Sequence, residues 1–221
     1  MFGHVLVSFY FSEDYPYKEV LDLLANRCLA DRTNAWTDTD HTCYTVYTAG
    51  SGGFLNILPI YMDHILHPLL RKEDFMTEVH HINGDGDDAG VVYSEMQVVI
   101  KHKVDNYEET FKNPFFQGVE NKPSSIIYFD LIKQIYPGNS SYTSQTGGRL
   151  KAIRESTTIE KVRAYHQKYY RPENMYITIT GNVDPNMLFA ALDPVERKII
   201  EKADDYSQLE KPFSVSSFLN F

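Results

Sequence analysis

Two pairs of histidines are spaced so that they could be considered for holding a metal ion. His64 and His67 stand at i and i+3 of an expected helix, and His80 adjoins His81. A catalytic zinc ion usually takes three protein ligands. The neighbours His80 and His81 would point apart on a helix. His64 and His67 could face one way, but no acidic residue near them has a suitable context. The histidine pairs therefore predict packed or solvent-facing side chains.

The spacing of apolar residues and of turn-forming residues divides the chain into helices and strands. In chain order we predict a strand at 5–11, a helix at 17–30, a strand or hairpin at 33–49, helices at 54–70, 72–82, 91–97 onward, 124–135 and 156–170, a strand at Met175–Thr180 and a short helix at 185–192. This alternation predicts an α+β domain with one antiparallel-rich sheet that helices cover on one face.

Composition and charge exclude several classes of protein. The 221 residues carry a formal net charge of −9 without a cluster of Lys and Arg, which argues against a nucleic-acid partner. No apolar run is long enough to span a membrane. Cys28 and Cys43 suit a reducing compartment, and the amino end lacks the features of a signal peptide. We expect an intracellular protein, cytoplasmic rather than mitochondrial, with no membrane partner.

Several motifs resemble, in their order and spacing, the amino-terminal domain of the insulysin/pitrilysin zinc metallopeptidases, in particular the presequence-protease-like branch. The motifs are Tyr15-Pro-Tyr-Lys, Leu29-Ala-Asp-Arg-Thr-Asn-Ala-Trp-Thr-Asp-Thr-Asp-His-Thr, Val79-His-His-Ile-Asn-Gly, Gly90-Val-Val-Tyr-Ser-Glu-Met, Tyr136-Pro-Gly-Asn-Ser-Ser-Tyr, Thr146-Gly-Gly-Arg-Leu, Tyr169-Tyr-Arg-Pro-Glu-Asn-Met and Ile179-Thr-Gly-Asn-Val-Asp. The resemblance covers residues 13–97 and 118–212. It implies a metallopeptidase half-domain that is incomplete at its amino end.

In that family two histidines of an H-x-x-E-H helix and a distant glutamate hold zinc, and the glutamate within the motif activates the metal-bound water. The resemblance places Glu95 at the distant ligand position, and it places Asp88 where many relatives carry a second acidic residue. The alternative for Glu95 is an ordinary glutamate on a helix surface.

The H-x-x-E-H motif itself is missing from its expected place before Tyr15. Only His4 is available there, followed at the required spacing by Val7 and Ser8, and the segment favours a strand over a zinc helix. We therefore expect no catalytic residue in this chain, no zinc bound by it, and no peptidase activity from it alone.

Three segments depart from the family pattern. Residues 1–12 stand where the zinc helix should be, residues 213–221 form an atypical tail, and 20 residues, Val98–Gln117, separate Glu95-Met-Gln from Gly118-Val-Glu-Asn. The composition of 98–117 and the codons possible at its ends suggest a translated intron. A surface insertion is the alternative, because loops tolerate insertions at small entropic cost.

The segment Thr33, Asn34, Ala35 and Trp36 resembles the edge strand on which the family lays its peptide substrate by backbone hydrogen bonds. Arg32 stands where relatives usually have glycine, so a long cation flanks this edge. The alternative for Trp36 is a core aromatic residue.

Two functions follow from the resemblance. The chain derives either from a zinc-dependent endopeptidase of which it lacks the catalytic part, or from a pseudo-peptidase that acts as a binding or scaffold subunit. Peptides, and a missing second half-domain or another subunit, are the expected partners. The absent strands would leave a sheet edge and an apolar face exposed.

Overall fold

The computed structural model describes residues 11–17, 20–100, 115–118, 121–136, 138 and 140–202, and for 98–100 and 115–118 the backbone alone. The chain divides into two compact units. Unit 1 comprises Met1–Ser8, Thr37–Thr42 and Lys72–Thr158, and unit 2 comprises Phe9–Trp36, Cys43–Arg71 and Ile159–Phe221.

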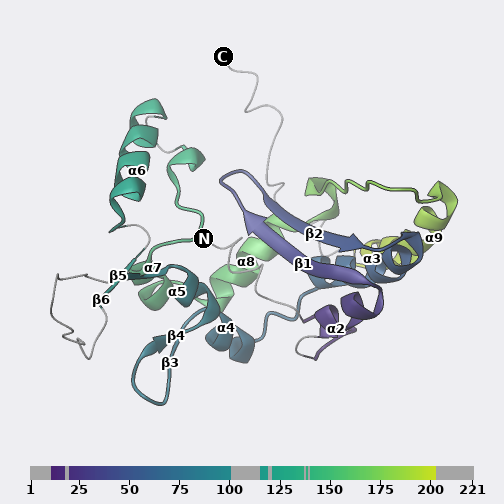
Figure 1. Cartoon of the computed structure of the whole chain (residues 1–221), viewed down its shortest axis with the longest axis horizontal. Helices are drawn as coiled ribbons and strands as arrows, with labels where there is room; N and C mark the ends of the chain where they lie inside the picture. The colour runs from purple at the N-terminus through teal and green to yellow at the C-terminus, as the bar shows by residue number, and fades with distance from the viewer. Residues whose placement is uncertain are drawn as a thin grey trace, which may run out of the picture. The chain divides into compact units, whose positions relative to one another are not determined.

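Helices dominate both units (Figure 1). Unit 2 holds α2 (Val20–Arg27), most of the hairpin β1 (Ala30–Thr37) and β2 (Thr42–Thr48), α3 (Ser51–Leu66), α8 (Ile159–Tyr169), η3 (Pro172–Asn174) and α9 (Pro185–Glu201). Unit 1 holds the tip of that hairpin, α4 (Lys72–Glu78), β3 (His81–Ile82), β4 (Asp88–Ala89), α5 (Val91–Glu95), β5 (Gln97–Ile100), β6 (Phe115–Gly118), α6 (Pro123–Ile135), η2 (Ser141–Thr143) and α7 (Leu150–Glu155).

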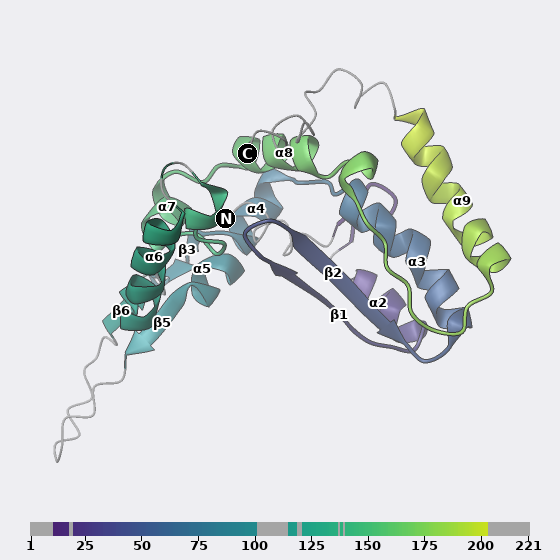
Figure 2. The same ribbon diagram turned by 90° about the horizontal axis from the view of Figure 1, so that it is seen from above.

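Helix α3 is the centre of unit 2 and lies between the β1–β2 hairpin and α9 (Figure 2). One side of it buries Ile57 and Tyr61 against α2 and the hairpin. The other side buries Leu58, Met62 and Leu66 against α9. Apolar residues therefore cover two sides of α3, and the helix predicted at 54–70 is confirmed with its bounds at Ser51–Leu66.

Two glycines allow close backbone approaches that a side chain would block. A Cβ atom at Gly53 would lie 2.0 Å from the carbonyl oxygen of Cys28, so glycine lets α3 pack directly on the end of α2. Gly90 has φ +129° and lies against the carbonyl of Val79. This second approach sets α5 beside α4 in unit 1.

A smaller core holds unit 1 together. Val79 after α4, Val92 on α5 and Ile153 on α7 are almost fully buried. By contrast α6 has no buried residue, and Ile127 and Leu131 are 69% and 53% exposed. Helix α6 therefore carries exposed apolar side chains along its length.

The sheet prediction is only partly correct. The hairpin within 33–49 is confirmed, but the described strands form three separate two-stranded antiparallel sheets, not one sheet with a helical cover. Met175–Thr180 is not a strand, because it has no ladder partner in the part of the chain that the structure describes. The α+β class holds at this coarser level.

Several helix boundaries also differ from prediction. The helix predicted at 72–82 ends at Glu78, and His81 and Ile82 enter β3. The short helix predicted at 185–192 runs to Glu201, through Pro194. It begins where the side chain of Asp184 accepts hydrogen bonds from the N–H groups of Asn186 and Met187.

The three atypical segments lie largely outside the described residues. Only Phe11 and Ser12 of 1–12 are described, and none of 213–221 is. Both ends of 98–117 are described: β5 pairs with β6 so that Gln97 stands opposite Gly118. Among the described helices, none is long and apolar enough to cross a membrane.

Candidate functional site

The β1–β2 hairpin positions the segment Thr33–Trp36. At its tip the N–H of Asp38 donates to the carbonyl of His41 at 2.8 Å. Groups along an antiparallel strand alternate between facing the partner strand and facing away from it. The N–H of Asp38 faces β2, so the backbone groups of every second residue before it face β2 as well. These residues are Trp36 and Asn34. Thr33 and Ala35 direct theirs away from it, to the edge where no described strand pairs.

The two faces of the hairpin differ in their burial. Tyr44 and Val46 pack on the apolar cluster formed by α2 and α3. Asn34 and Trp36 lie on the opposite face, where Trp36 is 47% exposed. The interpretation of Trp36 as a core aromatic residue is therefore wrong. Its indole is instead available beside the open edge.

Hydrogen bonds fix the hairpin to the helices beneath it. The hydroxyl of Thr33 donates to Asp22 of α2 at 2.8 Å. The hydroxyl of Tyr61 on α3 donates to the carbonyl of Thr45 at 3.0 Å. The edge strand is thus held on two helices and is preorganised for pairing. The side chain of Arg32 is not among those described.

Asp88, the predicted second acidic position, is the centre of a polar cluster in unit 1. His80 Nε2 lies 2.6 Å from one carboxylate oxygen, and Tyr93 and Arg154 donate to the other at 3.1 and 3.2 Å. Burial alone would raise the pKa of Asp88, but these three hydrogen bonds outweigh it and hold the pKa below its ordinary value. Asp88 is therefore a structural anion with both oxygens engaged.

Glu95, the predicted remnant of a zinc ligand, is the last residue of α5, and its side chain is exposed. Within the described ranges, no three or more His, Cys, Asp or Glu side chains come together to hold a metal ion. One exposed carboxylate and one fully engaged carboxylate do not fit the three-ligand zinc centre of a peptidase.

The helical prediction for His80 and His81 is wrong, although the two rings still turn to separate partners. Both residues follow α4, so His80 reaches Asp88, whereas His81 Nδ1 lies 3.1 Å from the carbonyl of Met76. The chain reverses between β3 and β4, and this reversal brings His80 to Asp88. Sequence spacing alone could not show that contact.

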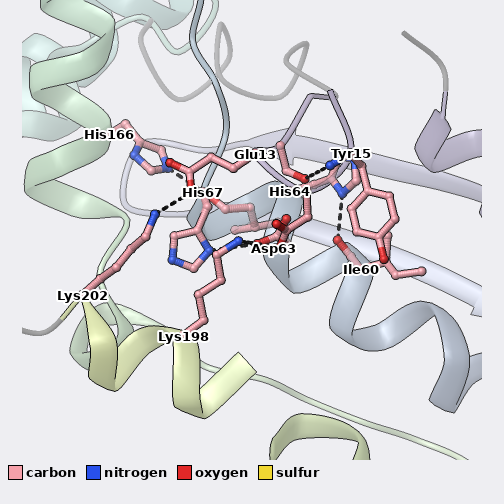
Figure 3. A network of polar contacts seen from close by, with 12 residues as sticks. Glu13, Tyr15, Ile60, Asp63, His64, His67, His166, Lys198 and Lys202 are labelled. Atoms are coloured by element: carbon pink, nitrogen blue, oxygen red, sulfur yellow. Dashed lines mark hydrogen bonds and ion pairs between the residues drawn. The ribbon is translucent and has the colours of Figure 1, made fainter. Parts of the chain in front are cut away.

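A second polar cluster, which the sequence did not predict, joins α3 to α9 in unit 2 (Figure 3). Lys198 Nζ donates to Asp63 at 2.6 Å and to Asp14 at 2.7 Å. His67 Nδ1 lies 3.1 Å from the same oxygen of Asp63. Burial alone would raise the pKa of Asp63, yet the hydrogen bonds from His67 and Lys198 hold it well below its ordinary value.

His64 on α3 and His67, directly after α3, are both packed, which is one of the two outcomes predicted for them. His64 is 4% exposed, hydrogen bonds to the carbonyl of Ile60 and stacks on Tyr15, with ring centroids 5.6 Å apart. His67 is 6% exposed. In the described part of the chain the Nε2 atoms of both rings have no hydrogen-bond partner, but no third ligand joins them.

One local signal could have revealed part of this cluster. Asp63 and His67 stand at i and i+4, a spacing that places them on one helix face. Lys198 follows Asp63 by 135 positions, and no local pattern relates the two.

Comparison with known proteins supports the resemblance carried by the motifs. Residues 156–216 match the family model described as Peptidase M16 inactive domain. An uncharacterized Caenorhabditis elegans protein, C05D11.1, is 48% identical over 203 residues, which is 92% of this chain. The mitochondrial presequence protease of Gibberella zeae is 26% identical over 93% of the chain, and presequence protease 1 of Arabidopsis thaliana is 28% identical over 79%.

The chain is related to the insulysin/pitrilysin-type peptidases of family M16. The matched regions make up 18%, 19% and 15% of these three relatives, so the chain spans less than a fifth of their length. The M16 relationship supports a peptidase lineage. What this M16-related chain can do must be argued from its own residues.

Proposed function

We propose that this M16-related chain binds extended peptides along the open edge of β1 and does not cleave them. The observation that carries this proposal is that the described sheet pairs β1 on one side only, with Thr33 and Ala35 facing the other. A peptide strand added there would gain backbone hydrogen bonds. The half-exposed ring of Trp36 offers an apolar contact for one of its side chains.

The absence of cleavage follows from the side chains available. Zinc peptidases of this lineage activate water with a metal ion and a glutamate of the H-x-x-E-H helix, and the sequence lacks that motif. Glu95 could contribute one oxygen ligand, which is too few to hold zinc tightly. The chain would therefore retain binding without hydrolysis.

A second candidate function is that of a peptidase half-domain completed by other polypeptide. It is favoured by the small share of each relative that the chain matches, and two of those relatives are named presequence proteases. In that case the zinc helix and a second half-domain come from elsewhere, and Glu95, exposed at the end of α5, supplies one ligand.

The binding test is fluorescence anisotropy with a labelled, uncharged peptide of alternating Thr and Val. Ala35→Pro removes an N–H that faces the open edge, and proline is tolerated at sheet edges. We expect it to weaken binding by up to about tenfold, as the loss of one hydrogen bond implies. Thr48→Pro is the matched control, because the same alternation directs its N–H to the opposite edge of the hairpin. Equal binding by all three proteins would contradict the proposal.

The cleavage test uses an internally quenched peptide with zinc added. We expect no turnover by the chain alone. Turnover that Glu95→Gln abolishes would show that the chain is a peptidase and would overturn this part of the proposal.

A further inference from the structure

The side chain of Asn34 accepts a hydrogen bond from one of the backbone N–H groups on the open edge of β1. Its Oδ1 atom accepts the backbone N–H of Ala35, the next residue, at 2.9 Å. The hairpin geometry directs this N–H away from β2, so it belongs to the row of groups to which an added strand would bond. Asn34 is itself exposed, on the face opposite the apolar cluster.

Exposed strand edges are usually protected against unwanted pairing. Charges, prolines, bulges and covering loops do this in many sheets. Here a short side chain bonds a donor that an incoming strand needs. Because the contact is between adjacent residues, forming it orders only one side chain.

We propose that Asn34 is an edge guard: its amide oxygen holds the Ala35 N–H in the free protein, and a peptide must displace it to pair with β1. This inference rests on the peptide-binding function proposed above. It adds a regulatory residue to that edge, since the strength of the Asn34 contact sets how readily the edge accepts a strand.

The guard has a signature that needs no peptide. Hydrogen exchange measured by NMR should be slow at the Ala35 amide in the wild-type protein and faster, by about tenfold, in Asn34→Ala. Asn34→Asp keeps an oxygen acceptor and should keep the amide protected. If Ala35 exchanges at the same rate in all three proteins, Asn34 does not guard the edge and the proposal is overturned.

Peptide affinity supplies the second readout, with the same uncharged Thr/Val peptide. Asn34→Ala should bind it about two- to tenfold more tightly than wild type, because no side chain has to be displaced. Asn34→Asp should bind no more tightly than wild type. Weaker binding by both variants would mean that the Asn34 NH2 group contacts the peptide directly, and this would overturn the guard.

The two proposals fail in distinguishable ways. If Ala35 exchange rises in Asn34→Ala but no protein binds the peptide, the peptide-binding function is wrong and so is the displacement step. If wild type and Asn34→Ala bind equally well, the function stands and the guard is overturned. Circular dichroism verifies that the exposed substitution leaves the fold intact.

Discussion

Each unit of the chain contains an aspartate that accepts hydrogen bonds from a histidine and from a cation. In unit 2, His67 and Lys198 approach the same oxygen of Asp63, whose side chain is 9% exposed. In unit 1, His80 and Arg154 bond to different oxygens of Asp88, whose side chain is 26% exposed. The two clusters therefore share a composition but differ in burial.

This difference determines what each cluster contributes. Asp63 is buried beside the apolar contacts between α3 and α9, so its charge depends on Lys198 for compensation. Water can reach Asp88, and solvent would partly replace a lost partner. We infer that unit 2 depends strongly on its ion pair, whereas unit 1 uses Asp88 mainly to orient His80, Tyr93 and Arg154.

The largest expected effect is the loss of Lys198. Lys198→Met should lower the free energy of unfolding by about 3 kcal/mol, because it leaves Asp63 charged and buried without a cation. Lys202→Met is the matched control, one turn later and directly after the end of α9. Lys202 pairs with Glu13, whose side chain is 52% exposed, so we expect a loss of less than about 1 kcal/mol. Urea unfolding measures the free energy of unfolding of both variants. Equal losses would contradict the expected difference between the buried pair of Lys198 and the exposed pair of Lys202.

The second-largest expected effect is that acid lowers the stability of unit 2. Although part of His166 reaches solvent, burial of its ring lowers its pKa to about 4, and burial also lowers the pKa of His64. Between pH 6.5 and about 4 the unfolded chain then binds more protons than the folded one, so stability falls as pH falls. We expect a loss of about 2 kcal/mol over this range.

The control for acid sensitivity is His166→Gln, which removes the buried ring and should flatten the dependence of the urea midpoint on pH. A wild-type midpoint that does not move between pH 6.5 and 4 would show that His166 and His64 are not held neutral in the folded state.

A smaller loss of stability is expected when the charge of Asp88 in unit 1 is removed. Asp88→Asn keeps the shape of the side chain but removes its charge, and we expect a loss of about 1 kcal/mol. Exchange of amides in α5 should quicken, since Tyr93 loses its charged acceptor. Asp85→Asn, in the exposed turn between β3 and β4, is the control and should have no effect. A loss as large as that of Lys198→Met would remove the distinction between the clusters.

Local patterns predicted the elements that position the edge site. Apolar spacing predicted α3 despite Pro59, and the Thr- and Tyr-rich alternation predicted the hairpin, because both signals arise within one element. Met175–Thr180 shows why a local strand signal is insufficient. Its residues favour a strand, but a strand also needs a partner, and none of the described segments pairs with it.

The contacts within the two polar clusters could not be predicted from the sequence for a different reason. Arg154 meets Asp88 across 66 positions and Lys198 meets Asp63 across 135, so each contact depends on how separate elements pack. The contact between Asn34 and Ala35 joins adjacent residues, yet the sequence did not predict it either. Whether Asn34 bonds the Ala35 N–H depends on which direction that N–H faces, and the hairpin register decides this.

The smallest expected effect is the deletion of residues 98–117. Opposed residues of an antiparallel pair have Cα atoms about 4.5–5.5 Å apart, and consecutive residues about 3.8 Å. Gln97 and Gly118 are such an opposed pair, so joining them directly requires only a small local shift. We expect the deletion to change the free energy of unfolding by less than about 1 kcal/mol. Exchange at Tyr93, in the Asp88 cluster, should be unchanged.

A variant in which Gly and Ser replace residues 98–117 separates the effect of loop length from that of sequence. It should be no more stable than the deletion, because it retains a loop to close without the β5–β6 pairing. A loss above about 2 kcal/mol on deletion would mean that unit 1 needs the segment, and neither the intron nor the surface insertion would then explain it. If deletion is tolerated, sequencing the transcript across codons 97–118 decides between those two origins.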